Sequence, residues 1–244
     1  MILEIRNLEK KFNNNQVLKN INLNIEEGTV LAVLGKNGSG KTTLIKLLTN
    51  ILLPCNGDIL YKGENIKRLR NKYIEKIGAV LEGNRNVYWY LTGEENIYYF
   101  GGLLGLSKNE IKVRGEELLK TFDLYEDRRK KVVHYSRGMQ QKLAIIIALL
   151  NNPTILFLDE PAIGLDVVSK KIMIDKIKYL SRNLGITIIL TTHQLDVVEL
   201  VADKIVLLEN GGIKNSENLK RFMEKYNSEL LYKILLDKRI AKFV

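Results

Sequence analysis

The chain has 244 residues, which is long enough for one large domain or for a core with an added lobe. Its 45% of hydrophobic and 27% of charged residues are ordinary for a globular protein, and only three prolines argue against long disordered linkers. The single cysteine, Cys55, excludes an internal disulfide, so nothing indicates a secreted domain held together by crosslinks.

The net charge of +10 has two interpretations. It is either a surface for nucleic acid or an anionic membrane, or an excess of lysine spread over solvated faces. The basic residues are scattered, so we favour the second interpretation and expect no direct contact with nucleic acid. The longest apolar run, Leu143 to Leu150, is far shorter than the roughly 20 residues of a membrane helix, and no signal peptide is visible. We therefore expect a cytoplasmic protein.

Strand patterns of two kinds occur along the chain. Near the N-terminus, residues 2–5 and 21–25 alternate between apolar and polar side chains, which is typical of antiparallel strands. Thr29 to Leu34 is instead continuously apolar and bounded by glycines, as expected of a strand buried on both faces. With helical segments between the strands, the pattern predicts an α/β fold with a mainly parallel sheet and an N-terminal antiparallel β subdomain. The later core strands have the same apolar character, namely Ile77 to Leu81, Ile155 to Leu158 and Ile186 to Leu190.

From Glu82 to Asn152 the strand signals vanish and helical spacing takes over, most clearly in Glu110 to Phe122 and Gln140 to Leu150. We interpret this region as a helical subdomain inserted between two strands of the core. The expected division is an α/β core with its β portion over residues 1–81 and 153–215, a helical subdomain over 82–152, and a C-terminal helical tail over 216–244.

The tail carries apolar side chains at helical intervals from Glu217 onward. A surface helix and a partner-binding helix both fit this spacing, and we favour a surface helix. The apolar residues are Leu219, Phe222, Met223, Tyr226, Leu230 and Ile234, with lysines between them.

Gly35 to Thr42 reads GKNGSGKT and matches the phosphate-binding pattern G-x-x-x-x-G-K-[ST]. It follows a buried strand and opens a predicted helix, Lys41 to Leu53, which is the context that the motif requires. Glycines let backbone N–H groups surround an anion, and the helix start adds donors and the positive end of its dipole. Lys41 supplies charge to the β- and γ-phosphates, and Thr42 supplies a hydroxyl to Mg²⁺. The loop predicts nucleotide binding by Gly35, Lys36, Asn37, Gly38, Ser39, Gly40, Lys41, Thr42 and Thr43.

Two carboxylates, Asp159 and Glu160, follow the strand at residues 155–158. Parallel α/β sheets bind ligands at the carboxyl ends of their strands, so Asp159 is placed to hold Mg²⁺. Glu160 should point in a different direction and can polarise the water that attacks the γ-phosphoryl group. Turns often begin with acidic residues, so the pair is informative only together with the phosphate loop. The two signals together predict an ATPase site.

The segments around these residues resemble the ATP-binding cassette (ABC) family over nearly the whole chain. Ile163 to Asp166, which follows Asp159-Glu160-Pro161, is similar to the family's D-loop. Thr191-Thr192-His193 is similar to the strand end that carries the family's switch histidine, and this implies that His193 reaches the γ-phosphate. Tyr135 to Gln141, YSRGMQQ, resembles the signature sequence that distinguishes the family from other P-loop ATPases. The resemblance implies a P-loop NTPase core.

The signature segment implies that the active unit is a pair of chains. Ser136 can cap the following helix and aim its N-terminus at an anion. In the family that anion is the γ-phosphate held by the other subunit, so Ser136, Gly138 and Asp166 are expected to contact nucleotide in a head-to-tail dimer. Phe12 falls where the family stacks an aromatic ring on adenine.

The sequence departs from the family pattern at three positions. In the signature, Arg137 stands for a usual glycine and Met139 for a usual glutamine. The strand at residues 77–81 should be followed by glutamine and is followed by Glu82. A carboxylate can still approach Mg²⁺ and the attacking water, so we include Glu82 among the expected catalytic and metal-contacting residues.

The resemblance implies the ATP-hydrolysing motor subunit of a transporter, which uses ATP and Mg²⁺ and acts with a transmembrane permease subunit at the cytoplasmic face of the membrane. Leu81 to Thr92 resembles the subset associated with drug or antibiotic export, and the aromatic residues around Trp89 suit a groove for a short permease helix. The cargo would be recognised by a different polypeptide. Two alternatives stay open, a nucleic-acid-associated ABC ATPase and a non-catalytic cassette, although the intact motifs oppose the second.

Overall fold

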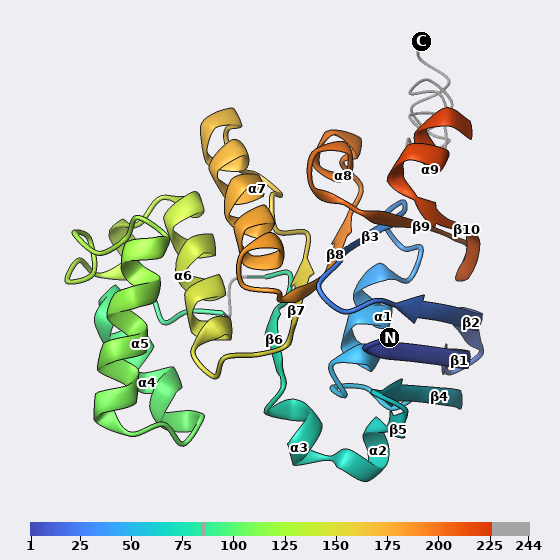
Figure 1. Cartoon of the computed structure of the whole chain (residues 1–244), viewed down its shortest axis with the longest axis horizontal. Helices are drawn as coiled ribbons and strands as arrows, with labels where there is room; N and C mark the ends of the chain where they lie inside the picture. The colour runs from blue at the N-terminus through green and yellow to red at the C-terminus, as the bar shows by residue number, and fades with distance from the viewer. Residues whose placement is uncertain (84–85, 226–244) are drawn as a thin grey trace.

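The computed structural model describes residues 1–83 and 86–225, and two sheets organise this part of the chain (Figure 1). The smaller sheet is antiparallel, in the order β2-β1-β4-β5. Strands β1 (Leu3–Phe12) and β2 (Asn15–Ile25) form a hairpin in which Leu3 lies opposite Ile25, as the alternation near the N-terminus predicts. Strands β4 (Asn56–Tyr61) and β5 (Glu64–Asn65) extend the sheet on the β1 side.

The larger sheet has six strands in the order β10-β9-β3-β8-β7-β6. Its central strands β3, β7 and β8 are buried at every residue, which confirms the prediction of strands covered on both faces. The edge strand β10 (Gly212–Asn218) runs antiparallel to its neighbour. The fold is therefore α/β with a mainly parallel sheet, as predicted. The parallel strands are β3 (Val30–Leu34), β6 (Ile77–Val80), β7 (Ile155–Asp159), β8 (Thr187–Thr192) and β9 (Lys204–Glu209).

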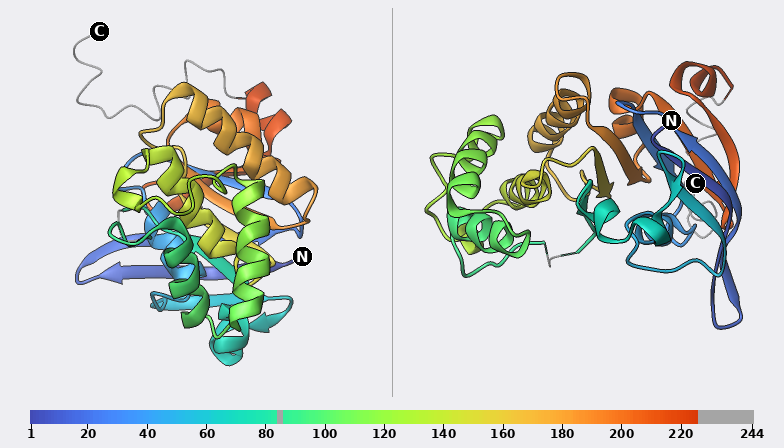
Figure 2. Two further views of the ribbon diagram at one scale, coloured as in Figure 1. Left: turned by 90° about the vertical axis from the view of Figure 1, so that its left-hand side faces the viewer. Right: turned by 60° about the horizontal axis from the view of Figure 1, so that its bottom comes forward.

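Three helices lie together beside the β6 edge of the larger sheet, namely α4 (Gly93–Leu103), α5 (Lys108–Thr121) and α6 (Arg137–Leu149) (Figures 1 and 2). Thr92 and Ser107 fix the starts of α4 and α5, because each forms a capping box with a glutamate three residues later. None of the helices in the described part of the chain is long and apolar enough to cross a membrane. The others are α1 (Lys41–Leu48), α2 (Ile66–Leu69), α3 (Asn71–Ile74), α7 (Val167–Arg182), α8 (Leu195–Val201) and α9 (Leu219–Lys225).

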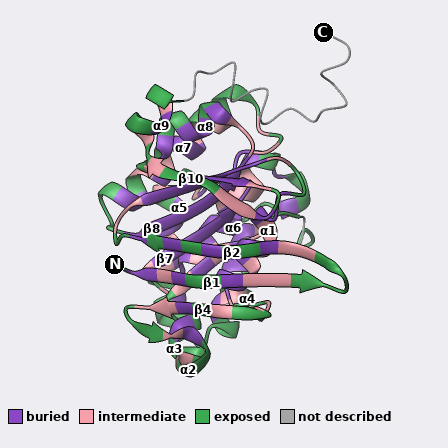
Figure 3. Cartoon of the chain, turned by 90° about the vertical axis from the view of Figure 1, so that its right-hand side faces the viewer, coloured by how far each residue is buried: buried purple, intermediate pink, exposed green. Residues whose placement is uncertain are grey.

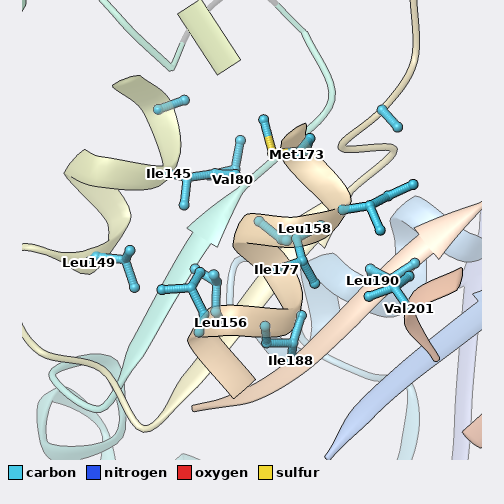
Figure 4. Packing of buried hydrophobic residues seen from close by; sticks show 14 of the residues in the cluster. Val80, Ile145, Leu149, Leu156, Leu158, Met173, Ile177, Ile188, Leu190 and Val201 are labelled. Carbon is cyan, nitrogen blue, oxygen red and sulfur yellow. The ribbon is translucent and has the colours of Figure 1, made fainter. Parts of the chain in front are cut away.

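Side chains alternate along each central strand and so contribute to two separate cores. Leu156 and Leu158 of β7 face a cluster with residues of α6, α7 and α8, part of which is drawn in Figure 4. Phe157, between them, faces a second cluster with α1 and the antiparallel sheet. Figure 3 shows how buried residues run through the strands of both sheets. The larger sheet is thus held from both faces, which fixes the positions of its strand ends.

The helices α1 and α9 show why some predicted boundaries differ from the observed ones. α1 ends at Leu48, not at Leu53, because Asn50 turns into the left-handed region with φ of 58° and the N–H groups of Ile51 and Leu52 both donate to the carbonyl of Lys46. In the tail, the helix begins at Leu219 rather than at Glu217, because β10 continues to Asn218 and the Asn218 side chain accepts from the Arg221 N–H. Phe222 of α9 is fully buried. Tyr226, Leu230 and Ile234 lie outside the described residues.

Candidate nucleotide-binding site

Four neighbouring parallel strands end at one edge of the larger sheet and carry the residues predicted to act on a nucleotide. In the order β3, β8, β7, β6, their carboxyl ends lead to the phosphate loop, to His193, to Asp159 with Glu160, and to Glu82. Because neighbouring strands lie about 4.8 Å apart, side chains that are distant in sequence become neighbours here. This edge is where parallel α/β sheets bind their ligands.

The phosphate loop joins β3 to α1 and has two positions that favour glycine. Gly38 has a φ of 80°, and a Cβ built there would meet nothing within 4 Å, so it borders open space. Gly40 has a φ of 106°, and a Cβ there would lie 2.8 Å from Cδ2 of Leu18. No side chain caps α1 at Gly40. The first N–H groups of the helix are therefore available to an anion.

Lys41 is the first residue of α1 and is only 6% exposed. Its Nζ donates to the carbonyls of Gly35 at 2.7 Å and Lys36 at 3.1 Å, and lies 3.5 Å from Oε1 of Glu160. A buried ammonium group needs such partners, since burial without them is strongly unfavourable. A bound phosphate can take over part of these contacts.

Thr191 of β8 contacts the carboxylate of Asp159 and the backbone of Glu160 at the end of β7. Its hydroxyl donates to Oδ1 of Asp159 at 2.5 Å, while the N–H of Glu160 donates to the hydroxyl and the carbonyl of Thr191, both at 3.1 Å. Glu160 has a φ of 51°, a left-handed conformation that gives its side chain a direction different from that of an extended residue. Asp159 Oδ2 and Glu160 Oε2 are buried without a hydrogen-bond partner in the described part of the chain.

His193, two residues after Thr191, contacts the same glutamate. Its Nδ1 lies 2.9 Å from Oε1 of Glu160. That oxygen therefore lies between the imidazole of His193 and the ammonium group of Lys41, and both groups restrain the carboxylate. The unpartnered Oε2 is left as a hydrogen-bond acceptor for a water molecule.

Lys41 and Glu160 border a cavity of about 470 Å³, which we call the nucleotide cavity, whereas Asp159 and His193 are not among its lining residues. Phe12 lines it from the end of β1 and is 44% exposed, with Nζ of Lys10 5.1 Å from the ring centroid. Glu82 lines it from the loop after β6. A cationic loop and an exposed aromatic ring on one cavity suit the phosphates and the base of a nucleotide. Gly35 and Lys36 do not line the cavity but accept hydrogen bonds from Lys41 through their carbonyls, and Ser39 is buried. The loop residues that line the cavity are Asn37, Gly38, Gly40, Lys41, Thr42 and Thr43.

Comparison with known proteins identifies the family. A family model described as "ABC transporter" matches residues 18–163, more than half of the chain. The chain belongs to the ABC transporter family. It is 33% identical to the ABC transporter ATP-binding protein NatA of Bacillus subtilis (strain 168) over 225 residues, which are 92% of this chain and 91% of NatA. It is 35% identical to the spermidine/putrescine import ATP-binding protein PotA of Clostridium novyi (strain NT), over 87% of this chain and 61% of PotA.

Among solved structures, the dimeric post-hydrolysis state of the ATP-binding cassette MJ0796, bound to ADP and Pi, matches with a TM-score of 0.79 and 29% identity. The match covers 89% of this chain and 99% of that one. The present chain is accordingly an ATP-binding, ATP-hydrolysing ABC transporter subunit with the P-loop fold that the sequence predicts.

Three residues predicted to contact nucleotide lie outside both the phosphate loop and the lining of the nucleotide cavity, namely Ser136, Gly138 and Asp166. Ser136 caps α6 by accepting from the N–H of Met139 at 3.2 Å. Asp166 caps α7 by accepting from the N–H of Ser169 at 2.9 Å and from its hydroxyl at 2.7 Å. A Cβ on Gly138 would lie 3.0 Å from Oγ of Ser169, so the starts of α6 and α7 are in contact. These residues form a second group, separate from the phosphate loop.

Sequence reasoning about this ABC ATPase missed two features of the site. Thr191 did not stand out, because a hydroxyl at the end of an apolar strand carries no signal until its neighbour is known. Val17 and Ile163 line the nucleotide cavity, and contact of their side chains with nucleotide was not predicted. Apolar β-branched side chains carry no functional signal, because they are common in any fold.

Proposed function

We propose that this ABC ATPase hydrolyses Mg-ATP in a head-to-tail dimer and thereby drives a separate transmembrane permease subunit at the cytoplasmic face of the membrane. Glu160 carries the proposal, because its Oε1 is 2.9 Å from Nδ1 of His193 and 3.5 Å from Nζ of Lys41 beside the phosphate loop. A carboxylate restrained in this way can accept a proton from water as the water attacks the γ-phosphorus and the bond to the bridging oxygen breaks.

We propose the remaining roles on the resemblance to the ABC family. We assign phosphate binding to the loop, adenine stacking to Phe12, and contact with the γ-phosphate to His193. Glu82 is assigned to the attacking water and the metal ion. The loop residues are Gly35, Lys36, Asn37, Gly38, Ser39, Gly40, Lys41, Thr42 and Thr43.

Mg²⁺ fits the oxygen donors at this site. Asp159 has a buried oxygen, Oδ2, without a partner in the described part of the chain, and Thr42 lines the nucleotide cavity. Within the same described residues, no group of three or more His, Cys, Asp or Glu side chains is arranged to hold a metal ion. This agrees with Mg²⁺, which usually takes one or two carboxylates together with substrate phosphates and water. Thr42 and Asp159 would hold the ion, and Glu82 would approach it. When bound, the ion would neutralise charge on the phosphates.

The dimer is supported by the residues that do not reach the nucleotide cavity of their own chain. Ser136 and Asp166 are exposed at the starts of α6 and α7, where a second chain can bring its nucleotide. The similar cassette MJ0796 is described as dimeric. We also propose the division expected from sequence, in which residues 82–152 form a helical subdomain inserted in the core.

The permease contact is assigned to the aromatic segment 88–90. Tyr88, Trp89 and Tyr90 are 48%, 40% and 83% exposed, and the Tyr88 ring packs against Tyr99 and Phe100 of α4. Exposed aromatic side chains on a firm support are typical interface anchors. We propose export as the direction, on the resemblance of residues 81–92 to exporters. PotA is named as an import protein, so transport into inverted membrane vesicles is the test of direction.

The test of the proposed function is Glu160→Gln. This variant should bind ATP normally, lose phosphate release, and accumulate as a closed dimer in the presence of Mg-ATP, seen by sedimentation. Glu199→Gln on α8 is the matched control, because Glu199 is exposed and away from the site, and it should keep normal turnover. Normal turnover in Glu160→Gln would remove Glu160 as the base.

A further inference from the structure

A second cavity, of about 150 Å³, adjoins the nucleotide cavity between the loop after β6 and the start of α6. Both cavities are lined by Glu82, Glu160 and Ile163, so they meet at the catalytic carboxylate. We call this second space the inter-loop cavity. Two of its lining residues, Glu82 and Arg137, are positions where the sequence departs from the ABC pattern.

The charges around the inter-loop cavity are unequal. Glu82, Asp159 and Glu160 contribute three carboxylates, whereas Arg137 is the cation among the lining residues. Glu160 already has Nζ of Lys41 3.5 Å from its Oε1, so Glu82 is the carboxylate that most needs a further cation. A glutamine after β6 would have been neutral, and Glu82 adds a negative charge close to where the nucleotide phosphates bind. Like charges this close repel one another even though Glu82 is exposed and water screens part of the interaction. A compensating cation is therefore needed most when nucleotide is present.

Arg137 lies where it can provide that charge. A Cβ built on Gly164 would lie 2.3 Å from Nη1 and 2.6 Å from Cζ of Arg137, so the guanidinium lies directly against the loop that joins Glu160 to Asp166. Neither Glu82 nor Arg137 forms an ion pair with another described residue. The two opposite charges face one cavity, and neither has an ionic partner among residues 1–83 and 86–225.

We propose that Arg137 is a positioning residue for Glu82, and that the two pair across the inter-loop cavity when nucleotide is bound. This inference rests on the proposed function, in which Glu82 approaches the attacking water. The pair would join the loop after β6 to the start of the signature helix α6. A planar guanidinium suits the task, because it can hold a carboxylate through two parallel N–H donors. The two departures from the family pattern then compensate each other.

The pairing predicts coupling between the two positions. Glu82→Gln and Arg137→Gln should each lower turnover, and the double variant should be no worse than the poorer single variant. The turnover of the double variant should therefore be about two- to fivefold higher than the product of the two single effects predicts. This is the size expected of an exposed ion pair. Arg137→Lys keeps the charge and should recover part of the loss. Arg129→Gln is the control, since Arg129 is exposed and away from the cavity, and its effect should multiply freely with that of Glu82→Gln.

Simple multiplication of the Glu82→Gln and Arg137→Gln effects would overturn the inference, because Arg137 would then act without Glu82, for instance on the phosphate of a partner chain. A readout independent of turnover separates this failure from failure of the proposed function. In the Glu160→Gln background, the rise in melting temperature caused by Mg-ATP should show the same coupling. If the melting temperatures show this coupling while Glu160→Gln retains normal turnover, Glu160 is not the base, but the pairing of Glu82 with Arg137 is supported. Melting of each variant without nucleotide confirms that it is folded.

Discussion

At the scale of single residues, Thr191 organises the site without touching a ligand. The register between β7 and β8 places Asp159 opposite Thr191, so one hydroxyl meets the carboxylate of Asp159 and the N–H of Glu160. Both carboxylates belong to a buried strand end, where an unsatisfied polar atom is costly. The direction of the Asp159 carboxylate and the backbone position of Glu160 therefore depend on a side chain of the neighbouring strand.

Thr191→Val keeps the shape of the side chain and removes the hydroxyl. We expect the free energy of unfolding to fall by about 1–3 kcal/mol, because Oδ1 of Asp159 loses its buried donor. Turnover should fall about tenfold or more, since a misdirected carboxylate is badly placed for its task. Urea unfolding and phosphate release measure the two effects.

Thr192→Val is the matched control for this change. Thr192 is also buried on β8, but its hydroxyl accepts from the N–H of Gln194 at 3.0 Å and does not contact Asp159. It should lose stability and keep its turnover per folded molecule. Equal loss of turnover in both variants would contradict the role given to Thr191.

The phosphate loop, Asp159 and Glu160 are predicted from residue types at fixed spacing along the chain, and the role of His193 is predicted from the resemblance to the ABC family. The nucleotide cavity brings the loop together with Phe12 and Glu82, which lie far apart in sequence. Thr191 could not be predicted, because its role depends on which strand lies beside β7. That information belongs to the order of strands in the sheet, which hydrophobic patterns do not encode.

At the scale of elements, the buried side-chain amide of Asn96 helps to hold the chain from Tyr88 to Thr92, which contains the aromatic segment 88–90. Asn96 of α4 is fully buried, accepts from the N–H of Tyr88 at 2.7 Å, and donates to the carbonyls of Tyr88 and Thr92 at 3.0 and 2.9 Å. The N–H of Val133 also donates to the carbonyl of Trp89 at 2.9 Å, three residues before Ser136. The aromatic segment is thus tied to the strip of chain that leads into the signature.

Asn96→Leu keeps the branched arrangement of side-chain heavy atoms and removes all three of these bonds. We expect a loss of about 2–3 kcal/mol in the free energy of unfolding, because backbone groups of Tyr88 and Thr92 lose buried partners. Asn109→Leu, at an exposed position of α5, should change stability by less than about 0.5 kcal/mol. Equal stability of the two variants in urea would show that the amide does not fasten the segment.

The start of α7 depends on pH through its cap. The N–H and the hydroxyl of Ser169 both donate to Asp166 and hold the pKa of that carboxyl below its usual value of 3.8. The cap therefore stabilises the folded state fully above that usual pKa, and its contribution is lost as the pH falls through the lowered one. Ser169→Ala should raise the pKa of Asp166 in an NMR titration. An unchanged pKa in that variant would exclude the hydroxyl as a cause.

Element types were more predictable than element ends. The buried strands β3, β7 and β8 were evident from continuous apolar runs, whereas the end of α1 was not, because the apolar pattern continues past Leu48 to Ile51, Leu52 and Leu53. What ends the helix is the conformation at Thr49 and Asn50, and this leaves no trace in hydrophobic periodicity. Strand β1 was underestimated because its irregular register past Ile5 breaks the two-residue alternation.

At the scale of the whole molecule, the proposed dimer makes a specific prediction about mixtures. Preparations of Lys41→Ala and Ser136→Glu should each lack turnover. The first lacks the positive charge that binds the phosphates, and the second carries a negative charge that repels the γ-phosphate. Mixed in equal amounts, they should form dimers in which one of two sites has an intact Lys41 and an intact Ser136. If the sites act independently, about one quarter of wild-type activity should return, from half the dimers with half their sites intact.

Phosphate release during titration of one preparation into the other checks this prediction. Lys41→Ala alone, at the total protein concentration of the mixture, is the control and should stay inactive. Activity that never rises above the sum of the two preparations would rule out sites shared between chains.

The separation of Ser136 and Asp166 from their own phosphate loop has a genetic consequence. When each site is built from two polypeptides, a damaged copy of the chain does more than fail by itself, because it also recruits sound copies into defective pairs. If transport needs both sites of a dimer, a cell that makes equal amounts of a normal and a Glu160→Gln chain should keep only about one quarter of its transport, because that share of the dimers contains two normal chains. On the proposed pairing, such alleles are expected to behave as dominant, in proportion to their expression.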